Sequence, residues 1–463
     1  MKTIWKPTLS DDKPLYLAIA DAMATDIAAG LLKPGQKLPP QRDLAWQLKV
    51  THGTVTRAYR EAEIRGLLAG EVGRGSFVRQ RHSTSPPLNL SAESSAVIDL
   101  SQAVPPPVHA NSEFDAALQH VMRQPSRLDL LDYMEAEGHP LHRAMGARWL
   151  ALSGIAVSDA EVIVTAGAHM GLIACLSTLL EPGETLLAEN LNYPSLKPTA
   201  RSLGLTVVPV EMDDGGLLPD AFERTARLGE AKCLYIVPTL QNPTTSTLSR
   251  QRRESIVEIA RRYNLVIIED DIFRLLDDRV QPPTLYELAP ERTYHITSLS
   301  KTLAPGLRIG FVAAPPGRAD LFRLQQRVAS GRSIGLTAEV ARYWMETDIA
   351  GNLMRRIIAE LAIRRTILQD AFRGLSYRCE PGAPFAWLPL PAYWSANRFV
   401  NELRSRDIKV SPGAAFSLGG RAQDRAIRIC FGEPQSRDEL RRAFTDIRQL
   451  MGHVPQDQFT PVA

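Results

Sequence analysis

The feature that most constrains the fold is a regular alternation of short apolar runs and helical stretches between residues 162 and 313. Each run has the length and the β-branched composition of a buried strand, and helical sequence separates most of the runs. This order predicts a three-layer α/β domain with a mostly parallel sheet, in which a ligand binds outside the carboxyl ends of the strands. The expected strands are residues 162–165, 185–188, 206–210, 233–237, 266–269, 294–297 and 309–313.

The sixth run leads directly into the most specific motif of the chain, the segment SLSKTLAPGLRIG at residues 298–310. Two serines precede Lys301, and Arg308 follows a Pro-Gly turn. A lysine amine can form a Schiff base with a carbonyl compound, while hydroxyl and guanidinium groups can hold a phosphate by charge-assisted hydrogen bonds. The segment therefore predicts a site for a phosphorylated carbonyl compound. The alternative is an ordinary surface turn that carries one lysine and one arginine.

The pattern S-x-S-K-x-x-x-P-G-x-R-x-G resembles the cofactor-lysine segment of fold-type I pyridoxal-phosphate (PLP) enzymes, the aspartate aminotransferase superfamily. The resemblance implies that the cofactor is pyridoxal 5′-phosphate and that Lys301 is the catalytic residue that forms the Schiff base with it. It also implies that three further side chains of this segment hold the phosphate, namely Ser298, Ser300 and Arg308.

A second phosphate-binding element is expected after the first strand, where the loop TAGAH at residues 165–169 opens a helix. Backbone amides at a helix start bind phosphate through the positive end of the helix dipole. The loop is similar to the phosphate-binding loop of the same superfamily. It adds Gly167, Ala168 and His169 to the expected cofactor-binding residues.

A carboxylate, Asp270, directly follows the apolar run 266–269 and is the candidate partner of the cofactor ring. Asp270 at this place can keep a pyridine nitrogen protonated, which makes the ring an electron sink. Taken alone, such a carboxylate is as well explained as a helix cap or an ion-pair partner. Its distance in sequence from Lys301 favours the cofactor role, with Asp271 as the second candidate.

The resemblance assigns four more positions around the cofactor. Tyr193 stands where the family has an aromatic side chain near the ring, and Asn242 matches the asparagine that hydrogen-bonds the ring hydroxyl oxygen. Phe273 replaces the usual tyrosine and cannot donate a hydrogen bond to that oxygen, so cofactor binding is expected and efficient turnover is not. Arg428 matches the arginine that grips a substrate or effector α-carboxylate bidentately, with an ordinary solvated arginine as the alternative.

The first eighty residues follow a different pattern. Apolar residues recur at helical spacing from position 15 to 29, and Pro40 opens a short helix at residues 41–48. A tight turn at residues 49–51 leads into a helix from His52 to about residue 65, and residues 67–78 indicate a glycine-tipped hairpin. Two short helices joined by a three-residue turn and followed by a hairpin predict a winged helix-turn-helix.

The segment PGQKLPPQRDLAWQLKVTHGTVTRAYREAEIRGLLAGEVGRGSFV, residues 34–78, resembles the DNA-binding domain of the GntR regulator family over nearly its full length. Residues at the start of the second helix are expected to face base edges in the major groove, and arginines at the first helix and at the wing tip to contact phosphate or the minor groove. His52 stands where the family often has arginine, so the operator is expected to differ, unless His52 is a solvated or capping residue. The expected DNA-binding residues are Arg42, Thr51, His52, Thr54, Arg57 and Arg74.

Charge agrees with this division. Residues 1–82 hold 13 Lys/Arg and 8 Asp/Glu, a net charge of +5, and the remaining 381 residues hold 41 and 43, a net charge of −2. The positive charge that gives the chain its overall +3 therefore lies at the N-terminal end. The domain boundaries follow: residues 1–79 for DNA binding, 80–112 as a Ser/Pro-rich linker, and 113–463 as an aminotransferase-like domain, with a large part at about 150–330 and a small α+β part at about 340–463.

The remaining composition predicts a cytoplasmic protein, and the resemblance to the GntR family implies a bacterial one. The sequence shows no signal peptide and no uninterrupted apolar run of membrane length. The four cysteines are scattered and lack metal-ligand spacing, so no metal site is expected.

The whole chain resembles the MocR subfamily of GntR-family transcriptional regulators, a winged helix-turn-helix fused to a fold-type I PLP domain. The resemblance implies a homodimer that binds a double-stranded promoter operator and senses an amino-acid or amine effector through an aldimine at Lys301. The alternatives are a catalytically active aminotransferase with a regulatory DNA-binding domain, and a regulator that senses PLP itself. At most weak transaminase activity is expected.

Overall fold

The structure is a computed structural model of the 463-residue chain. It describes residues 5, 7, 13–29, 31–33, 35–65, 67–71, 75–78, 97–108, 110–330, 334–419 and 425–454. The chain divides into two compact units, Met1–Ser94 and Ser95–Ala463. Residues 79–96 lie outside the described part, and residues 80–96 of these are the first half of the expected linker.

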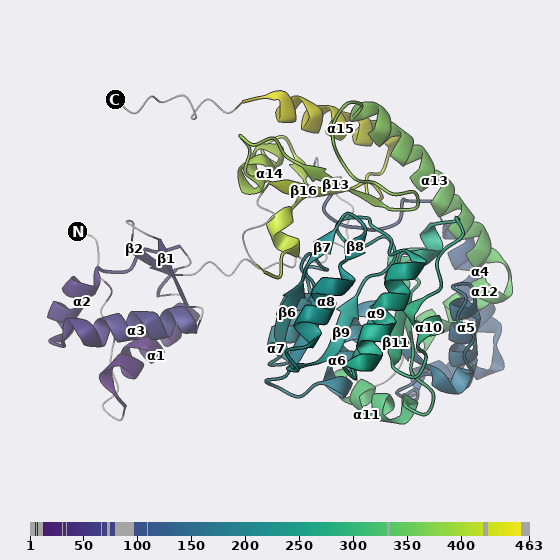
Figure 1. Cartoon of the computed structure of the whole chain (residues 1–463), viewed down its shortest axis with the longest axis horizontal. Coiled ribbons are helices and arrows are strands. Elements are labelled where there is room, and N and C mark those ends of the chain that lie inside the picture. Colours follow the sequence, from purple (N-terminus) through teal and green to yellow (C-terminus); the bar gives the residue numbers. More distant parts are fainter. Residues whose placement is uncertain are drawn as a thin grey trace. The chain divides into compact units, whose positions relative to one another are not determined.

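The first unit carries three helices and a hairpin in its described residues, in the order predicted from the sequence (Figure 1). Pro40 precedes the second helix, and Lys49 ends it in the left-handed conformation (φ 53°). Thr51 begins the third helix, since its Oγ1 accepts a hydrogen bond from Thr54 N (3.2 Å). The elements are α1 (Leu15–Ala28), α2 (Gln41–Leu48), α3 (His52–Ile64), β1 (Leu68–Glu71) and β2 (Gly75–Val78).

The second unit is built on a seven-stranded sheet with the order β4-β12-β11-β10-β9-β5-β6. All neighbouring strands pair in parallel except β12, which is antiparallel to both of its neighbours. The seven strand runs expected from the sequence are the seven strands of this sheet, with ends that differ by at most two residues. The strands are β4 (Val162–Thr165), β5 (Thr185–Glu189), β6 (Thr206–Val210), β9 (Ala231–Ile236), β10 (Val266–Asp270), β11 (Thr293–Ser298) and β12 (Gly310–Ala313).

Helices cover both faces of this sheet because the strand side chains alternate between two hydrophobic clusters. In β10, Ile268 packs toward α6, α7 and α11, while Ile267 packs toward α8, α9 and α10 on the other face. Near β4 and β12 the second face is covered by α5 and α12. The helices are α4 (Asn111–Arg123), α5 (Pro140–Ala151), α6 (Ala168–Leu179), α7 (Leu196–Ser202), α8 (Pro219–Ala226), α9 (Arg250–Arg262), α10 (Leu285–Leu288), α11 (Ala319–Ser330) and α12 (Leu336–Glu346).

A smaller part follows the long helix α13 (Ile349–Ala371), which runs along one side of the second unit in Figure 1. It holds a three-stranded sheet of the order β13-β16-β15 between α14 and α15. The strand β14 pairs in parallel with β3, which lies over 300 residues earlier in the chain. The elements are β3 (Ile98–Asp99), β13 (Phe385–Pro389), α14 (Ala396–Arg404), β14 (Ile408–Lys409), β15 (Ser411–Pro412), β16 (Ala426–Cys430) and α15 (Arg437–Gly452).

Short elements complete the second unit. A two-stranded ribbon is formed by β7 (Met212–Asp213) and β8 (Gly216–Leu217). Short 3₁₀ helices are η1 (Pro125–Leu131), η2 (Asp159–Glu161), η3 (Arg274–Leu276), η4 (Pro305–Leu307) and η5 (Gly413–Phe416). Within the described ranges, every helix is too short or too polar to cross a lipid bilayer.

Candidate functional site

One pocket of the second unit gathers the side chains that the sequence analysis singled out. It lies at the carboxyl ends of β9, β10 and β11 and at the start of α6, where an α/β sheet places its ligands. Ten of the eleven expected cofactor-binding residues line it, and the eleventh, Gly167, lies against Arg308. The lining residues are Ala168, His169, Leu172, Tyr193, Val237, Asn242, Asp270, Ile272, Phe273, Ser298, Ser300, Lys301 and Arg308.

The segment around Lys301 and the start of α6 meet at very close range. Gly310 begins β12, and a Cβ added there would lie 2.6 Å from the Gly167 carbonyl carbon and 2.8 Å from Ala168 N. Only glycine therefore permits this approach. Arg308, in the left-handed conformation (φ 55°), donates from Nη2 to Ala166 O (3.1 Å). The helix start and the guanidinium thus share one corner of the pocket.

Two serines supply hydroxyls at this corner. Ser298 ends β11 and is buried, and Ser300 is buried two residues later. Ser300 Oγ has no hydrogen-bond partner within the described residues. A buried hydroxyl without a partner costs free energy, so this one is suited to receive a polar ligand group. Helix amides, hydroxyls and a guanidinium together form an anion-binding corner.

Asp270 is a buried carboxylate with one oxygen unoccupied. Its Oδ2 accepts a hydrogen bond from Tyr235 Oη (2.6 Å), while Oδ1 has no partner among the described residues. Burial raises the pKa of Asp270 to about 6, and the Tyr235 hydrogen bond opposes this rise. The arrangement leaves Oδ1 able to accept a hydrogen bond from a protonated ring nitrogen.

Lys301 presents its amine to the pocket from the turn after β11. Nζ donates a hydrogen bond to the backbone carbonyl of Ala103 (2.6 Å). Burial of the amine, followed by the positive charge of Arg428, lowers the pKa of Lys301 to about 8. More of this amine is therefore neutral near neutral pH than in an ordinary lysine, and the neutral form is the nucleophile.

Arg428 approaches the pocket from β16 in the smaller part. It is buried, with its guanidinium over the rings of Phe416 (4.7 Å) and Phe385 (5.5 Å). Nη1 donates to Asn242 Oδ1 (2.7 Å), and Nη2 donates to the backbone carbonyl of Ser101 (2.5 Å). The sequence alternative of an ordinary solvated arginine is wrong, because the side chain is only 5% exposed.

Two aromatic side chains border the ring-sized part of the pocket. Phe273 is buried, with its ring edge-on to Phe385 (centroids 5.3 Å apart). Tyr193 is half-buried and lies edge-on to His169 (6.0 Å), whose pKa is lowered by burial and by the charge of Arg308. Phe273 brings no hydroxyl to the pocket, because a phenylalanine side chain has none.

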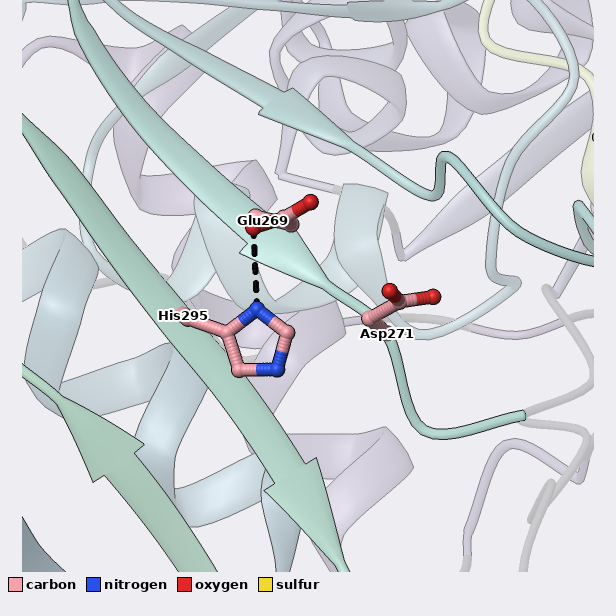
Figure 2. Close-up of side chains that lie close together, drawn as sticks. All are labelled: Glu269, Asp271 and His295. Atoms are coloured by element: carbon pink, nitrogen blue, oxygen red, sulfur yellow. Dashed lines mark hydrogen bonds and ion pairs between the residues drawn. The ribbon is translucent and has the colours of Figure 1, made fainter. Parts of the chain in front are cut away.

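The two acidic neighbours of Asp270 in the sequence belong to a separate group: Figure 2 shows Glu269, Asp271 and His295 close together, each with one possible metal-ligand atom within 4.8 Å of the others. His295 Nδ1 hydrogen-bonds Glu269 Oε2 (2.9 Å), and Glu269 also accepts from the backbone amides of residues 285 and 286. Arginine cations already face both carboxylates: Arg253 lies 3.8 Å from Glu269 and Arg274 lies 3.6 Å from Asp271.

This group behaves as a buried charge cluster. Burial opposes the ionisation of Glu269, but His295 and Arg253 outweigh it and lower the pKa of Glu269. Burial raises the pKa of Asp271 although Arg274 opposes the rise. Because strand side chains alternate, Glu269 and Asp271 lie on the opposite side of β10 from Asp270. The pocket therefore receives a single carboxylate from this acidic run, and the arginines compensate the other two.

The expected DNA-binding residues of the first unit surround the turn between α2 and α3. His52 and Arg42 are exposed, and Arg57 is exposed with its guanidinium 4.2 Å from the ring centre of Tyr16. Thr51 and Thr54 hydrogen-bond each other through their hydroxyls (2.8 Å), so their side chains also hold the helix start. Arg74 lies outside the described residues.

Sequence reasoning missed several groups of the pocket. Tyr235 contacts Asp270 because β9 and β10 are parallel neighbours with Tyr235 opposite Ile268, a register that no sequence pattern indicated. The carbonyls of Ser101 and Ala103 were missed because a backbone oxygen has no sequence signature. Val237, Leu172 and Ile272 also line the pocket, and their apolar side chains gave no signal beyond burial.

Comparison with known families gives two matches. Residues 95–444 match the model of class I and II aminotransferases, and residues 15–78 match the model of the gntR family of bacterial regulatory proteins. Together the two matches account for both units of the chain. The match of residues 95–444 alone spans well over half of the sequence.

Full-length relatives share this combination. The chain is 30% identical to the uncharacterized HTH-type transcriptional regulator YdeF of Bacillus subtilis, over 96% of both chains. It is 28% identical to the vitamin B6 salvage pathway transcriptional repressor PtsJ of Salmonella typhimurium, over 94% of this chain and 97% of that one.

Among solved structures, an archaeal alanine:glyoxylate aminotransferase is similar, with a TM-score of 0.71 and 24% identity over 77% of this chain and 91% of that chain. At this identity the similarity shows that the second unit has the aminotransferase fold.

Proposed function

The chain belongs to the class I and II aminotransferase family and, with its gntR-type head, has the MocR architecture of transcriptional regulators; on that basis we propose that it senses an amino-acid or amine effector on a cofactor held at Lys301. The chain is a DNA-binding regulator with a PLP-type aminotransferase domain, and its cofactor is pyridoxal 5′-phosphate. When bound, PLP supplies an aldehyde that captures amines reversibly and a ring that accepts electrons.

The groups of the pocket fit this cofactor. The anion-binding corner formed by Ser298, Ser300, Arg308 and the start of α6 would take the phosphate. The unoccupied Asp270 Oδ1 would accept a hydrogen bond from the protonated ring nitrogen, while Tyr235 continues to donate to Oδ2. Lys301 would carry the aldehyde, since its lowered pKa favours the nucleophilic form.

Arg428 is the observation that carries the effector assignment. It is a buried cation joined to Asn242, a pocket residue, through a 2.7 Å hydrogen bond, and it stands beside the pocket that holds Lys301. A guanidinium held between two aromatic rings keeps a fixed orientation, which suits bidentate binding of a carboxylate. The amine of an effector that also bears a carboxylate could therefore replace Lys301 on the cofactor aldehyde, releasing the lysine amine, while its carboxylate binds Arg428.

Phe273 supports sensing over turnover. A tyrosine at this position would place a hydroxyl beside the ring oxygen of the cofactor, where it would help to keep the lysine nitrogen reactive. The buried Phe273 ring packs on Phe385 and offers no donor. Capture of an amine needs less from the pocket than repeated transfer of its amino group, so the site favours a regulator that binds its effector and returns to its starting state.

The regulator would act as a homodimer on a promoter. Large apolar side chains stand exposed close together around η1: Leu128, Leu131 and Tyr133 are 62%, 83% and 88% exposed. Such a patch is typical of a subunit interface. Operators read by two helix-turn-helix heads require two copies of the protein.

The test combines two readouts on the full-length chain. PLP-loaded protein is titrated with single amino acids and amines while its absorption spectrum and its affinity for a DNA duplex, selected from a random pool, are measured together. We expect one effector class to change the spectrum and the DNA affinity at the same concentration, with no keto acid formed. Lys301→Ala should lose the visible band and both responses.

Two results would contradict the proposal. Sustained formation of keto acid with a second keto acid as acceptor would indicate a working aminotransferase. A DNA affinity that stays the same with every amine, and with or without PLP, would show that the second unit does not control the first.

A second candidate is a regulator that senses the cofactor itself. PtsJ, a relative over nearly the whole chain, is named as a repressor of vitamin B6 salvage. In that case PLP alone would change the DNA affinity, and amines would add nothing. The same titration separates the two candidates, because its first step is the addition of PLP to cofactor-free protein.

A further inference from the structure

The chain segment that enters the second unit makes hydrogen bonds to both residues assigned to the effector. This covering segment, residues 97–108, pairs with β14 of the smaller part and reaches both Lys301 and Arg428. Lys301 Nζ donates to Ala103 O (2.6 Å), and Arg428 Nη2 donates to Ser101 O (2.5 Å). Its main-chain oxygens therefore contact the lysine that would carry the cofactor and the arginine that would bind an effector carboxylate.

The covering segment is held in this place by a built set of contacts. Its β3 pairs with β14, with Leu100 N donating to Lys409 O (2.7 Å) and Cys430 N donating to Leu100 O (2.8 Å). Gly432 lies so close that a Cβ there would overlap the carbonyl oxygen of Val104. Ile98 and Leu100 are buried in the core of the smaller part.

Asp99 links the orientation of Ser101 to this anchoring. Its Oδ1 accepts hydrogen bonds from Ser101 N (2.7 Å) and Ser101 Oγ (2.6 Å), and its Oδ2 pairs with Lys409 Nζ (2.6 Å). Ser411 Oγ adds a second donor to Ser101 O (3.2 Å). Asp99 itself touches neither Lys301 nor Arg428 in these interactions, so it positions the carbonyl without belonging to the ligand site.

The Ser101 carbonyl occupies part of the edge at which Arg428 would bind a carboxylate. Of the five N–H groups of the guanidinium, one on Nη1 donates to Asn242 and one on Nη2 donates to Ser101, while Nε has no partner among the described residues. A carboxylate that binds the two Nη atoms side by side competes with the Ser101 carbonyl for Nη2. The Ala103 carbonyl competes with the cofactor instead, because its hydrogen bond to Lys301 Nζ is lost when that nitrogen carries the aldehyde.

We propose that residues 101–104 are a built-in competitor for the effector, and that an effector carboxylate at Arg428 displaces them. This inference rests on the proposed function and adds the step by which the site signals. The covering segment begins three residues after Ser94, where the first unit ends, so the displaced residues lie near the start of the second unit. An event at Arg428 thereby reaches the part of the second unit that follows the first unit in the chain.

Hydrogen exchange of the full-length protein tests the displacement. The probe is N-(5′-phosphopyridoxyl)-L-leucine, which carries the phosphate, the ring and an α-carboxylate in one stable molecule. The comparison is pyridoxamine 5′-phosphate, which lacks the carboxylate. We expect the first compound to speed exchange of the amides of residues 98–104 by about ten-fold or more, as their hydrogen bonds open, and the second to leave them unchanged.

A variant of the anchor gives an independent measure. Asp99→Ala should bind phosphopyridoxyl-leucine on the order of five-fold more tightly, the factor expected when a competitor loses a hydrogen bond of ordinary net strength. Binding of pyridoxamine 5′-phosphate should not change. The matched control is Asp213→Ala. Like Asp99, Asp213 forms an ion pair, here with Arg252 (2.6 Å), and accepts a hydrogen bond from the backbone amide two residues later, Gly215 N (2.8 Å).

The outcomes separate the two hypotheses. If phosphopyridoxyl-leucine binds but exchange at residues 98–104 stays the same or slows, the displacement is wrong and the proposed effector site stands. If neither compound binds, both the site and its displacement are wrong. The exchange measurement uses the unmodified chain, so it decides the question even if Asp99→Ala fails to fold.

Discussion

At the scale of single residues, Lys301 and Asp270 stand in one pocket with pKa values that burial moves in opposite directions. Burial lowers the pKa of Lys301 to about 8 and raises that of Asp270 to about 6. Both shifts favour the neutral form, because a low-dielectric site penalises charge. The pocket is thus prepared for a ligand that brings its own charges: a phosphate, a protonated ring nitrogen and a carboxylate.

The first prediction at this scale concerns pH. Attack on the PLP aldehyde needs neutral Lys301, so the rate at which cofactor-free protein gains its visible absorption band should rise with pH and level off above about 8. Arg428 is the second cause of the lowered pKa; Arg428→Gln should therefore raise the pKa of Lys301 and move the profile to higher pH. A midpoint near the ordinary lysine value of about 10.4 in the unmodified protein would contradict this.

The second prediction at this scale concerns Phe273. Phe273→Tyr would place a hydroxyl next to the ring oxygen of the cofactor. We expect it to speed single-turnover transfer of an amino group by about ten-fold or more, since a hydrogen bond to a charged group contributes over 1.4 kcal/mol. Stopped-flow absorbance of the PLP-loaded chain with an amino acid measures this rate. Phe273→Leu is the control that changes packing without adding a hydroxyl; equal rates in all three proteins would show that the missing hydroxyl is not what limits turnover.

At the scale of elements, the pocket depends on the close contact of β12 with the start of α6. Gly310→Ala should push the helix start outward, destabilise the protein by about 1–3 kcal/mol and weaken PLP binding, because its Cβ would meet main-chain atoms that cannot rotate away. Gly306→Ala, four residues earlier in the same motif, is the matched control: no atom lies within 4 Å of its added Cβ. Urea unfolding and PLP titration measure both effects, and similar losses in the two variants would refute the steric explanation.

The helix α3 carries the prediction on DNA. His52→Ala should relax preference at one base pair by about 1–3 kcal/mol, because a base-edge contact is lost. If Arg42 contacts a phosphate as expected, Arg42→Ala should instead weaken binding to every sequence and reduce the salt slope by about 1. Binding to a set of single-base variants of the selected duplex, at several salt concentrations, distinguishes these patterns. Unchanged base preference in His52→Ala would make His52 a solvated residue.

Elements were largely predictable from the sequence, whereas long-range pairing was not. All seven sheet strands were located because their apolar runs are short, β-rich and separated by helices, and the helix-turn-helix was located from Pro40 and its periodic apolar residues. The pairing of β14 with β3 was missed, since two-residue strands leave no periodic signal and their partners lie over 300 residues apart.

The residues of the pocket likewise divide into those that could be predicted from the sequence and those that could not. Side chains that the cofactor motif names, such as Lys301 and Arg308, could be predicted because their chemistry is tied to residue type. Tyr235 depended on strand register, and the Ser101 and Ala103 acceptors on main-chain atoms that every residue possesses. Sequence patterns carry information neither on strand register nor on the positions of main-chain oxygens.

At the scale of the whole molecule, dimerisation is the remaining prediction. Leu131→Asp would place a charge in the exposed apolar patch around η1, and we expect it to shift the protein from dimer to monomer in sedimentation at micromolar concentration. Val280→Asp is the control, since Val280 is fully exposed outside this patch. A dimer that survives Leu131→Asp unchanged would place the interface elsewhere.

The covering segment has a consequence for how such regulators diversify. Its contacts to Lys301 and Arg428 use the carbonyl oxygens of Ser101 and Ala103, which remain when the side chains at these positions mutate. Descendants of this chain can therefore change residues 101–104 and the apolar wall of the pocket, and so acquire new effectors, without rebuilding the part that competes with them. In this architecture the ligand preference can thus change while the contact that signals is kept.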